Sequence, residues 1–550
     1  MSKRKILYNA KIYTVCGENW NLYPQKAMVI NSEGNVELVG DDEDFIHFSH
    51  YENEFIDMNG RIILPGFVDA HVHAPGTSLT ELFEVDLFNC ETVEQFKGKI
   101  GAFADSHPEM EKIYGTGFNM SLIDEDGNPP CAKWIDDICP DRAVILQSSD
   151  MHSNLFNSKA MEVVKFFNDE LNGIGIIHKD SKGNYTGLCT DIWTVNVPRR
   201  QFTMEEQELA MKCFQNKMNS WGYTSMMAIA PMSKGITPDV LYKITEEGSS
   251  SVRINTAILI KPESFKEDLK RLEAYQEKMT GSDIIINTAK FMMDGVIEGG
   301  TAYLDEDYRD KPGFRGVPNW DYDEFVTALR ISLQKGFQIH VHAIGDAAVN
   351  MTIDAIEEAQ KSEGVFDKRN VITHLQLVRD EDIPRLAQNG IIAAIQTFWH
   401  YKEPGFYDNI NLPLLGETRS NKMYPAKSLK TAGVIITNSG DYPVSSENNP
   451  MLGIQIGITR NAWEFHISDE NDERFLLNAD ERLSVKDMIE AYTINGAYQL
   501  FRENEIGSLE PGKKADYIVL DNDPFNVPHH EIKDIRVLET CLGGETVFKA

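Results

Sequence analysis

Long hydrophobic stretches are missing from this 550-residue sequence. No apolar run approaches the roughly 20 residues that a helix needs to span a bilayer. The start, Met1-Ser2-Lys3-Arg4-Lys5, is basic, but the segment after it alternates polar and apolar residues and has no continuous apolar core like that of a signal peptide. We therefore expect a soluble protein without a membrane partner.

Paired cysteines are also missing. The seven cysteines are odd in number and scattered without a CxxC pair, at Cys16, Cys90, Cys131, Cys139, Cys189, Cys213 and Cys541. This spacing favours neither a disulfide framework nor a cysteine-ligated zinc site. The expected location is a reducing, cytoplasmic compartment.

Positive charge is scarce. The chain carries 53 lysines and arginines against 85 aspartates and glutamates, which gives a formal net charge of −32. A field of this sign repels phosphate backbones and anionic membrane surfaces, so nucleic acid is not expected as a partner. Hydrophobic residues at 42% and charged residues at 25% are those of a globular protein with ample material for a large core.

Both ends of the chain are rich in short β-forming segments. These segments lie at residues 6–15, 27–30 and 36–40 near the N-terminus and at residues 512–521, 535–542 and 545–548 near the C-terminus. We expect the two ends to pair into one small β-sandwich, formed by residues 1–61 and 505–550.

Between these ends, apolar strands alternate with helical segments over residues 62–504, which indicates parallel βα units. An α/β barrel with insertions can run past about 400 residues, so this length suits one large domain. Eight candidate strands lie at residues 62–73, 224–230, 252–260, 284–291, 337–342, 371–374, 391–396 and 434–441. The predicted fold class is α/β, a (β/α)8 TIM-like barrel joined to the terminal β-sandwich.

The first step of this barrel is too long for a simple βα unit, because residues 81–215 separate the first two strands with several further β-forming segments. An insertion at the end of the first strand would lie over the barrel mouth, where active-site loops are found. We therefore expect a lid-like subdomain at about 81–215.

Two histidines, His71 and His73, end the first barrel strand. Side chains at positions i and i+2 of a strand point to the same face, so the two imidazoles converge. Imidazole is the commonest protein ligand of zinc-like metals. The pair alone is also compatible with two hydrogen-bonded core histidines, so the choice depends on what the other strands supply.

The fourth strand carries a lone lysine, Lys290, inside apolar sequence. A buried, charged and unpaired lysine is costly, so Lys290 must be neutral, paired or chemically modified. A neutral amine can react with carbon dioxide to give a carbamate, an oxygen ligand able to bridge two metals. The alternatives are a side chain that reaches solvent and a salt bridge to a nearby acid such as Asp294.

Later strands end in further metal-binding residue types. The fifth strand holds His340 and His342, and His342 is the better ligand because it lies nearer the strand end, whereas His340 is expected to be a deeper packing or supporting residue. His374 ends the sixth strand and Asp441 ends the eighth. The carboxyl ends of the strands form the catalytic face of such a barrel, so these side chains are expected to meet there.

This constellation resembles the amidohydrolase superfamily, and more closely its amidohydrolase-3 branch, which includes N-substituted formamide deformylases. The matching segments keep the order of the branch and run over nearly the whole chain, at residues 64–73, 150–153, 290–295, 342–346, 373–376, 440–444 and 507–516. The resemblance implies a set of metal ligands at the strand ends, with a carbamylated lysine as bridge: His71, His73, His342, His374, Asp441 and Lys290.

Two motifs depart from the branch. Its usual Asp-Gly-His-Ser is Asp150-Met151-His152-Ser153 here, and its usual Gly-Ser-Asp is Ser439-Gly440-Asp441. Both departures keep the histidine and the aspartate in place, but Met151 is expected to narrow the pocket.

Such ligands, with an open position, describe a catalytic zinc-type site in which one or two divalent ions lower the pKa of water to about 7. Asp441 is the candidate to take a proton from that water and pass it to a leaving nitrogen. His152 is a candidate to polarise the substrate carbonyl, or else a capping histidine of the lid. Arg419 is a candidate to bind a substrate carboxylate, or else a salt-bridged loop residue.

We therefore expect a metal-dependent hydrolase that cleaves a C–N bond of a small molecule, and the resemblance favours an N-substituted amide or formamide. A deaminase or cyclic-amide hydrolase with the same site is an alternative, because the metal ligands indicate the type of reaction more reliably than they indicate the substrate. A catalytically inactive regulatory or binding protein is a third possibility, but all six ligand positions carry competent residues. The family also suggests a homodimer.

Overall fold

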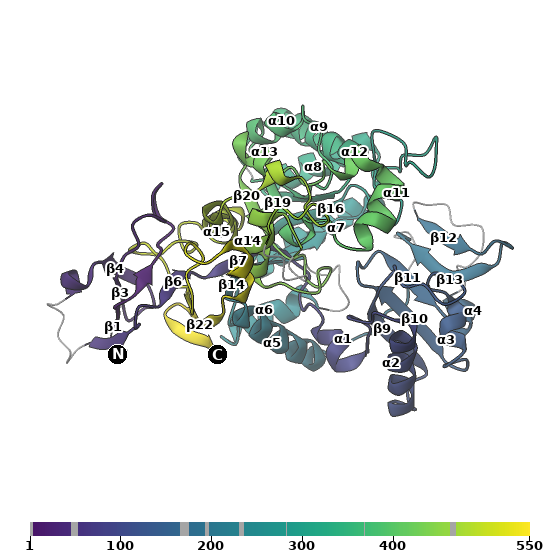
Figure 1. The fold of residues 1–550 in the computed structure, drawn as a ribbon, viewed down its shortest axis with the longest axis horizontal. Coiled ribbons are helices and arrows are strands. Elements are labelled where there is room, and N and C mark those ends of the chain that lie inside the picture. The colour runs from purple at the N-terminus through teal and green to yellow at the C-terminus, as the bar shows by residue number, and fades with distance from the viewer. Residues whose placement is uncertain are drawn as a thin grey trace.

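The computed structural model describes residues 4–45, 53–164, 175–192, 197–229, 236–281, 283–367, 369–462 and 469–550. An eight-stranded barrel occupies the centre of the molecule (Figure 1). β-sheets from the chain termini lie at one end of the barrel, and a six-stranded sheet lies at the other. None of the helices in these ranges combines the length and the hydropathy that a membrane crossing requires.

The barrel strands are parallel and follow one another in chain order. They are β7 (Phe67–Val72), β14 (Tyr223–Ile229), β15 (Arg253–Leu259), β16 (Ile285–Met292), β17 (Gln338–Ala343), β18 (Val371–His374), β19 (Ile392–Ile395) and β20 (Ile436–Asn438). The first and last strands contact each other, so the sheet is nearly closed. The predicted barrel is confirmed, although Ala230, the last residue of the second predicted strand, lies outside the described ranges.

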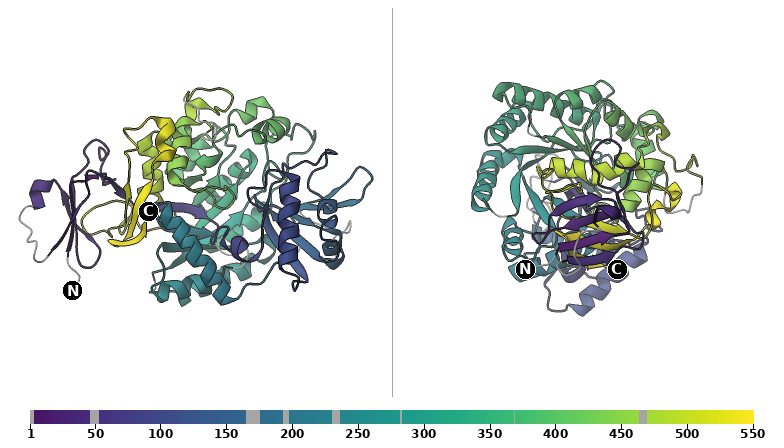
Figure 2. Two further views of the ribbon diagram at one scale, coloured as in Figure 1. Left: turned by 60° about the horizontal axis from the view of Figure 1, so that its bottom comes forward. Right: turned by 90° about the vertical axis from the view of Figure 1, so that its left-hand side faces the viewer.

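Helices surround this sheet (Figure 2). They include α5 (Met204–Ser220), α6 (Pro238–Glu246), α7 (Phe265–Lys278), α8 (Tyr322–Gln334), α9 (Asp346–Glu363), α10 (Ile383–Gln388), α13 (Ala426–Thr431), α15 (Val485–Tyr492) and α16 (Ile494–Gln499). Local chemistry determines where several of them begin. In α8, for example, the carboxylate of Asp321 accepts hydrogen bonds from the backbone amides of Asp323 and Glu324, which satisfies donors that a helix start leaves unpaired.

The first predicted strand, residues 62–73, is divided between two sheets. Its beginning, β6 (Ile62–Pro65), pairs with a C-terminal strand, whereas β7 enters the barrel. Gly66 stands at the junction, and a Cβ atom there would lie 2.2 Å from Oγ1 of Thr224, closer than real Cβ contacts allow. A residue without a side chain therefore lets the chain pass between the two sheets.

The terminal sheets pack against each other. One contains β1 (Arg4–Tyr8), β3 (Ala27–Ile30), β4 (Val36–Gly40) and β5 (Asn53–Asp57), and the other contains β2 (Lys11–Ile12), β6, β21 (Tyr517–Leu520), β22 (Val537–Leu542) and β23 (Glu545–Lys549). Met28, Ile63 and Val519 are among the buried apolar residues that they share. Strands from both ends of the chain thus build one β-structure, as the sequence predicts. The predicted limits of 1–61 and 505–550 leave out β6, so we propose residues 1–65 and 505–550 as its limits.

The long first insertion forms a sheet of its own. Its strands are β8 (Val85–Asp86), β9 (Lys112–Phe118), β10 (Ala143–Ser148), β11 (Ser153–Phe156), β12 (Ile176–Lys179) and β13 (Tyr185–Thr190). It has a separate apolar core that includes Phe96, Trp134 and Leu146. Residue 215, the predicted end of the insertion, lies inside helix α5, which packs on β14 of the barrel. We propose that the insertion ends before this helix.

Candidate functional site

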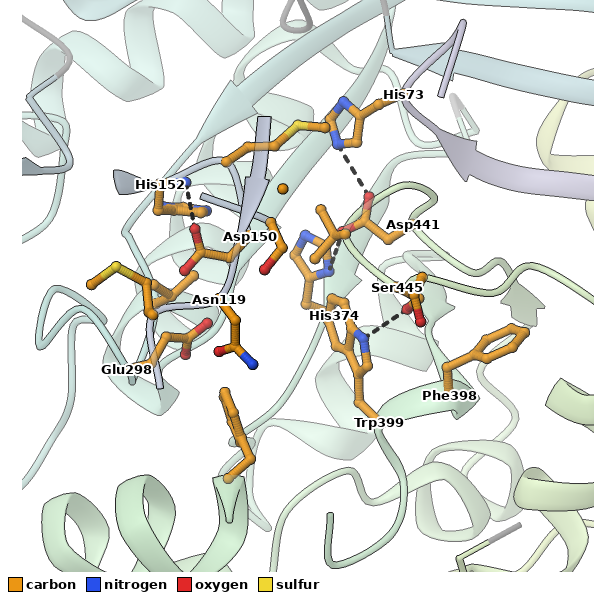
Figure 3. Close-up of a pocket in the computed structure, with 18 of the residues that line it drawn as sticks. His73, Asn119, Asp150, His152, Glu298, His374, Phe398, Trp399, Asp441 and Ser445 are labelled. Atoms are coloured by element: carbon orange, nitrogen blue, oxygen red, sulfur yellow. Dashed lines mark hydrogen bonds and ion pairs between the residues drawn. The ribbon is translucent and has the colours of Figure 1, made fainter. Parts of the chain in front are cut away.

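Histidines and one aspartate from three barrel strands meet at the mouth of the barrel (Figure 3). Nε2 of His71 lies 3.2 Å and Nε2 of His73 lies 3.1 Å from Oδ1 of Asp441. Nδ1 of His374 lies 4.0 Å from the other carboxylate oxygen. One ligand atom from each of His71, His374 and Asp441 can be chosen so that the three lie within 4.8 Å of one another, a spacing that suits one metal ion. His342 lies beside this group, with its ring centre 4.6 Å from that of His374.

Three histidines of this group are neutral. Burial lowers the pKa of His71, His342 and His374 well below the usual 6.5. A neutral imidazole carries a lone pair on one ring nitrogen, and that is the form that binds a metal. The protonation state of these three histidines therefore suits metal ligation.

Neighbouring acceptors decide which nitrogen carries that lone pair. Nδ1 of His374 lies 2.9 Å from Oε1 of Gln396, and Nε2 of His342 lies 3.0 Å from the carbonyl oxygen of Gly295. A ring nitrogen facing an oxygen acceptor carries the hydrogen, so the lone pair is on Nε2 of His374 and on Nδ1 of His342. Hydrogen bonds of this kind orient histidine ligands in metal sites.

The backbone is strained at two residues of the site. His374 has φ of 81° and Asp441 has φ of 53°, both in the left-handed region that residues other than glycine rarely adopt. Such conformations cost about 1–3 kcal/mol each and concentrate at functional sites. The surrounding barrel therefore holds both side chains in positions that the local backbone would not choose.

Lys290 lies inside the barrel, buried and uncharged for much of the time at neutral pH. Its Nζ atom has no hydrogen-bond partner among the described residues, and burial lowers its pKa to about 7. The salt bridge to Asp294 is not formed. The Asp294 carboxylate instead accepts hydrogen bonds from the backbone amides of Tyr303, Ile344 and Gly345. Because the side chain neither reaches solvent nor pairs with this acid, a neutral amine and a chemically modified one are the alternatives that remain.

His340 lies deeper in the barrel than His342, as the sequence predicts. It is fully buried, and its Nε2 atom lies 2.9 Å from Nδ1 of His71. Because this contact is with a candidate ligand, His340 is a supporting residue.

A cavity of about 630 Å³ opens over these residues and is lined by both the barrel and the insertion. The insertion contributes Asn119, Asp150 and His152, which point toward the cavity opposite Trp399 (Figure 3). The indole of Trp399 stacks on His374 with ring centres 5.4 Å apart. The volume suits a small molecule, bounded by a polar wall and an aromatic wall.

His152 pairs with a carboxylate of the insertion. Its Nδ1 atom lies 2.6 Å from Oδ1 of Asp191. Burial lowers the pKa of His152, but the negative charge and the hydrogen bond of Asp191 outweigh this and raise it to about 9. At neutral pH this imidazole is therefore positively charged, unlike the histidines on the barrel strands.

Arg419 is the predicted site residue that the structure does not bring to the cavity. Its guanidinium donates to the backbone carbonyls of Leu415, Glu306 and Asp307, and it does not line the cavity. Met151, in contrast, does line it, and has φ of 65° where the family usually has glycine. Met151 thus lies on the cavity wall next to His152 in the chain, and its narrowing of the pocket stays a prediction.

Sequence reasoning missed Asp191 and Trp399. Asp191 follows β13, so the rule that polar residues at strand ends carry function would have found it if applied to the insertion as well as to the barrel. Trp399 follows β19, one of three barrel strands, with β14 and β15, that end without a predicted site residue. Neither contact can be read from local spacing.

Comparison with known proteins agrees with this geometry. Residues 54–548 match the model of the Amidohydrolase family. The protein YtcJ of Bacillus subtilis (strain 168) is 26% identical over 506 residues, which are 90% of this chain and 91% of YtcJ. The N-substituted formamide deformylase of Arthrobacter pascens is 22% identical over 563 residues, covering 98% of this chain and 97% of that protein.

A solved structure shares the fold. An uncharacterised metal-dependent hydrolase from Pyrococcus horikoshii OT3 superposes with a TM-score of 0.71 at 23% identity, over 96% of this chain and 99% of that chain. Because the family match extends over most of the sequence, this protein belongs to the amidohydrolase family and is an enzyme that hydrolyses carbon–nitrogen bonds.

Proposed function

We propose that the enzyme hydrolyses the C–N bond of a small-molecule amide or formamide at a divalent metal centre. The observation that carries the proposal is the convergence of imidazoles on the buried carboxylate of Asp441 at the mouth of the barrel. The proposed ligands are His71, His73, His342, His374 and Asp441.

The side chains present fit such a metal. Nζ of Lys290 and Nδ1 of His73 are buried without a hydrogen-bond partner among the described residues, whereas buried polar atoms are normally paired. A nitrogen-rich set with one carboxylate favours zinc. If Lys290 is carbamylated, it can bridge two ions; as a free amine it leaves a site for one. A bound metal of this kind polarises a carbonyl and makes water nucleophilic at neutral pH.

Asp441 moves the proton in this proposal. Burial raises its pKa, but the hydrogen bond and charge of His73 outweigh this, so the pKa of Asp441 is lowered and the group is ionised at neutral pH. The carboxylate accepts a proton from the attacking water and passes it to the leaving nitrogen. His152 binds the carbonyl oxygen from the insertion side, where its positive charge stabilises the negative charge that develops on that oxygen.

The substrate class rests on two supports. The cavity of about 630 Å³ suits a small molecule, and its aromatic wall at Trp399 suits an apolar substituent on the amide nitrogen. The relative from Arthrobacter pascens is an N-substituted formamide deformylase. All seven cysteines are free, which fits a reducing cytoplasm as the proposed compartment.

Metal analysis and a substrate panel test the proposal. We expect the purified enzyme to contain zinc or another divalent ion and to lose activity with a chelator. Hydrolysis of a panel of N-formyl and N-acyl amines is measured by the amine released. A parallel assay for ammonia detects deamination. Absence of a transition metal, together with activity that a chelator leaves intact, would refute the metal-dependent mechanism.

A further inference from the structure

We propose that Asp191 is a positioning residue that holds the imidazole of His152 toward the substrate, and that Thr301 of the barrel holds Asp191 in turn. This inference rests on the proposed function, because it assigns His152 to the substrate carbonyl. Nothing in the local sequence joins these three residues. The insertion provides the first two, and the loop after β16 provides the third.

Asp191 binds His152 through both its side chain and its backbone. Oδ1 of Asp191 lies 2.6 Å from Nδ1 of His152, and the backbone amide of Asp191 donates to the carbonyl oxygen of His152 at 2.9 Å. Nδ1 and Nε2 lie on different edges of the ring, so a bond at Nδ1 turns Nε2 away from Asp191. We assign Nε2 to the substrate carbonyl.

The second carboxylate oxygen of Asp191 is occupied as well. Oδ2 accepts a hydrogen bond from Oγ1 of Thr301, and the same hydroxyl accepts one from the backbone amide of Val296 at 3.0 Å. Asp191 and Thr301 are both buried. A carboxylate with both oxygens bonded in a buried place has little freedom to rotate, which is what a positioning residue requires.

Gly295, on the barrel side of the contact between Asp191 and Thr301, also contacts a proposed metal ligand. A Cβ atom on Gly295 would lie 2.6 Å from Oδ2 of Asp191 and 2.1 Å from Oγ1 of Thr301, so only glycine fits there. The carbonyl oxygen of the same Gly295 faces Nε2 of His342 at 3.0 Å. The loop at Gly295 therefore orients His342, a proposed metal ligand, and also packs against Asp191, which orients His152.

Backbone conformation agrees with a functional contact. Asp191 has φ of 51°, in the left-handed region, although aspartate is only moderately tolerated there. Strain at such a position persists when the surrounding structure enforces it. The positive charge that Asp191 stabilises on His152 also suits a group that binds a developing negative charge.

A spectroscopic experiment tests the contact without any substrate. Histidine is labelled with 15N in the full-length enzyme, and the ring signals of His152 are identified as those lost in His152→Gln. We expect Asp191→Asn to shift these signals, because its neutral amide no longer carries the charge that faces Nδ1. Unchanged ring signals would overturn the proposal, whether or not the enzyme hydrolyses amides.

A double-mutant cycle tests the catalytic consequence. We expect Asp191→Asn to lower kcat by about 10- to 100-fold with little change in KM, since it weakens one stabilising group and leaves the rest. In the His152→Gln background, the same substitution should cost less than about twofold, because its effect passes through His152. Equal losses in the two backgrounds would refute the positioning role.

Two substitutions of Thr301 test the same contact in case Asp191→Asn does not fold. Thr301→Val removes the hydroxyl and should lower kcat, whereas Thr301→Ser keeps it and should restore activity to near the wild-type level. The matched control is Asp136→Asn. Asp136 is an insertion carboxylate that binds the backbone and hydroxyl of Ser158 and does not line the cavity, so its variant should keep wild-type kcat.

The outcomes separate this inference from the proposed function. If the wild-type enzyme contains no metal and hydrolyses no amide, the proposed function fails, and the 15N signals still decide whether Asp191 orients His152. If the enzyme is active and depends on His152 but not on Asp191 or Thr301, the positioning role alone fails.

Discussion

The barrel contains two His-x-His pairs, and they are used differently. In the first, His71 and His73, both Nε2 atoms lie within 3.2 Å of Asp441. In the second, His342 lies beside His374 at the mouth, whereas His340 lies one layer deeper and contacts the ring of His71. The same i, i+2 spacing thus gives two candidate ligands in one strand and a ligand with a supporting residue in the other.

The difference follows from depth along the strand. β7 ends at Val72, so His73 lies just beyond the strand and His71 only one residue inside it. β17 continues to Ala343, which places His342 near its end and His340 two residues further inside. If His71 binds metal through Nε2, its Nδ1 donates to Nε2 of His340. Strand spacing therefore predicts the direction of a side chain, and distance from the strand end decides its role.

Removal of the ligand of the second pair should have the largest effect. We expect His342→Ala to lower turnover by more than about 1,000-fold, because loss of a ligand forfeits several kcal/mol of transition-state stabilisation. Bound metal measured by elemental analysis should fall, and the circular dichroism spectrum should not change. Unaltered turnover in a folded variant would exclude His342 as a ligand.

Replacement of Lys290 tests whether a carbamylated lysine binds metal together with the histidines of the two His-x-His pairs. Lys290→Met should lower turnover by about 100-fold if a carbamate helps to bind metal. The free energy of unfolding should rise by about 1–3 kcal/mol in metal-free protein, because an unpaired buried amine is removed. Intact-protein mass spectrometry and metal content are the measurements. Wild-type metal content and turnover in the variant would argue against a bridging lysine.

Replacement of His340, the supporting histidine of the second pair, should lower turnover less than replacement of His342. His340→Gln should weaken metal affinity by about 10- to 100-fold, as loss of a ligand's hydrogen-bond partner does in other metal sites. Excess metal should then restore most of the turnover, which it cannot do for His342→Ala. A variant that is inactive even at saturating metal would show that depth along the strand does not separate the two roles.

The stability that His152, the positively charged histidine of the insertion, contributes should depend on pH, in contrast to that of the two His-x-His pairs. Asp191 raises the pKa of folded His152 from 6.5 to about 9, so the protonated ring stabilises the fold. This contribution is complete below pH 6.5 and is lost as the pH rises through about 9. Measured by chemical denaturation, the stability advantage of wild type over His152→Gln should shrink by about 3 kcal/mol across this range. A difference independent of pH would contradict the ion pair.

Arg419 should have the smallest effect on catalysis. Its three hydrogen bonds go to backbone carbonyls outside the cavity. Arg419→Ala should cost about 1–2 kcal/mol of stability and leave KM within about twofold of wild type. An increase in KM of about tenfold or more, confined to substrates with a carboxylate, would bring Arg419 back as a binding residue.

Much of the fold was predictable because its signals are local. Apolar runs of strand length, alternating with amphipathic helices, indicate parallel βα units wherever they occur. Thus eight barrel strands and the pairing of the two chain ends follow from the sequence. Within residues 62–73, Pro65-Gly66 marks the passage from the terminal sandwich into the barrel, and the structure divides the segment between two sheets at this point.

The sequence by itself determined which residue types stand at the carboxyl ends of the barrel strands, and the closed parallel sheet brings those ends together. Only the tertiary structure decided that Asp294 binds backbone amides and leaves Lys290 unpaired, that Arg419 lies outside the cavity, and that Asp191 meets His152 and Thr301. The contacts of Asp191, and that of Asp294 with Ile344, join residues 39 to 110 positions apart in the chain. The contact of Asp191 with Thr301 depends on how the insertion packs against the barrel, and no local spacing encodes that.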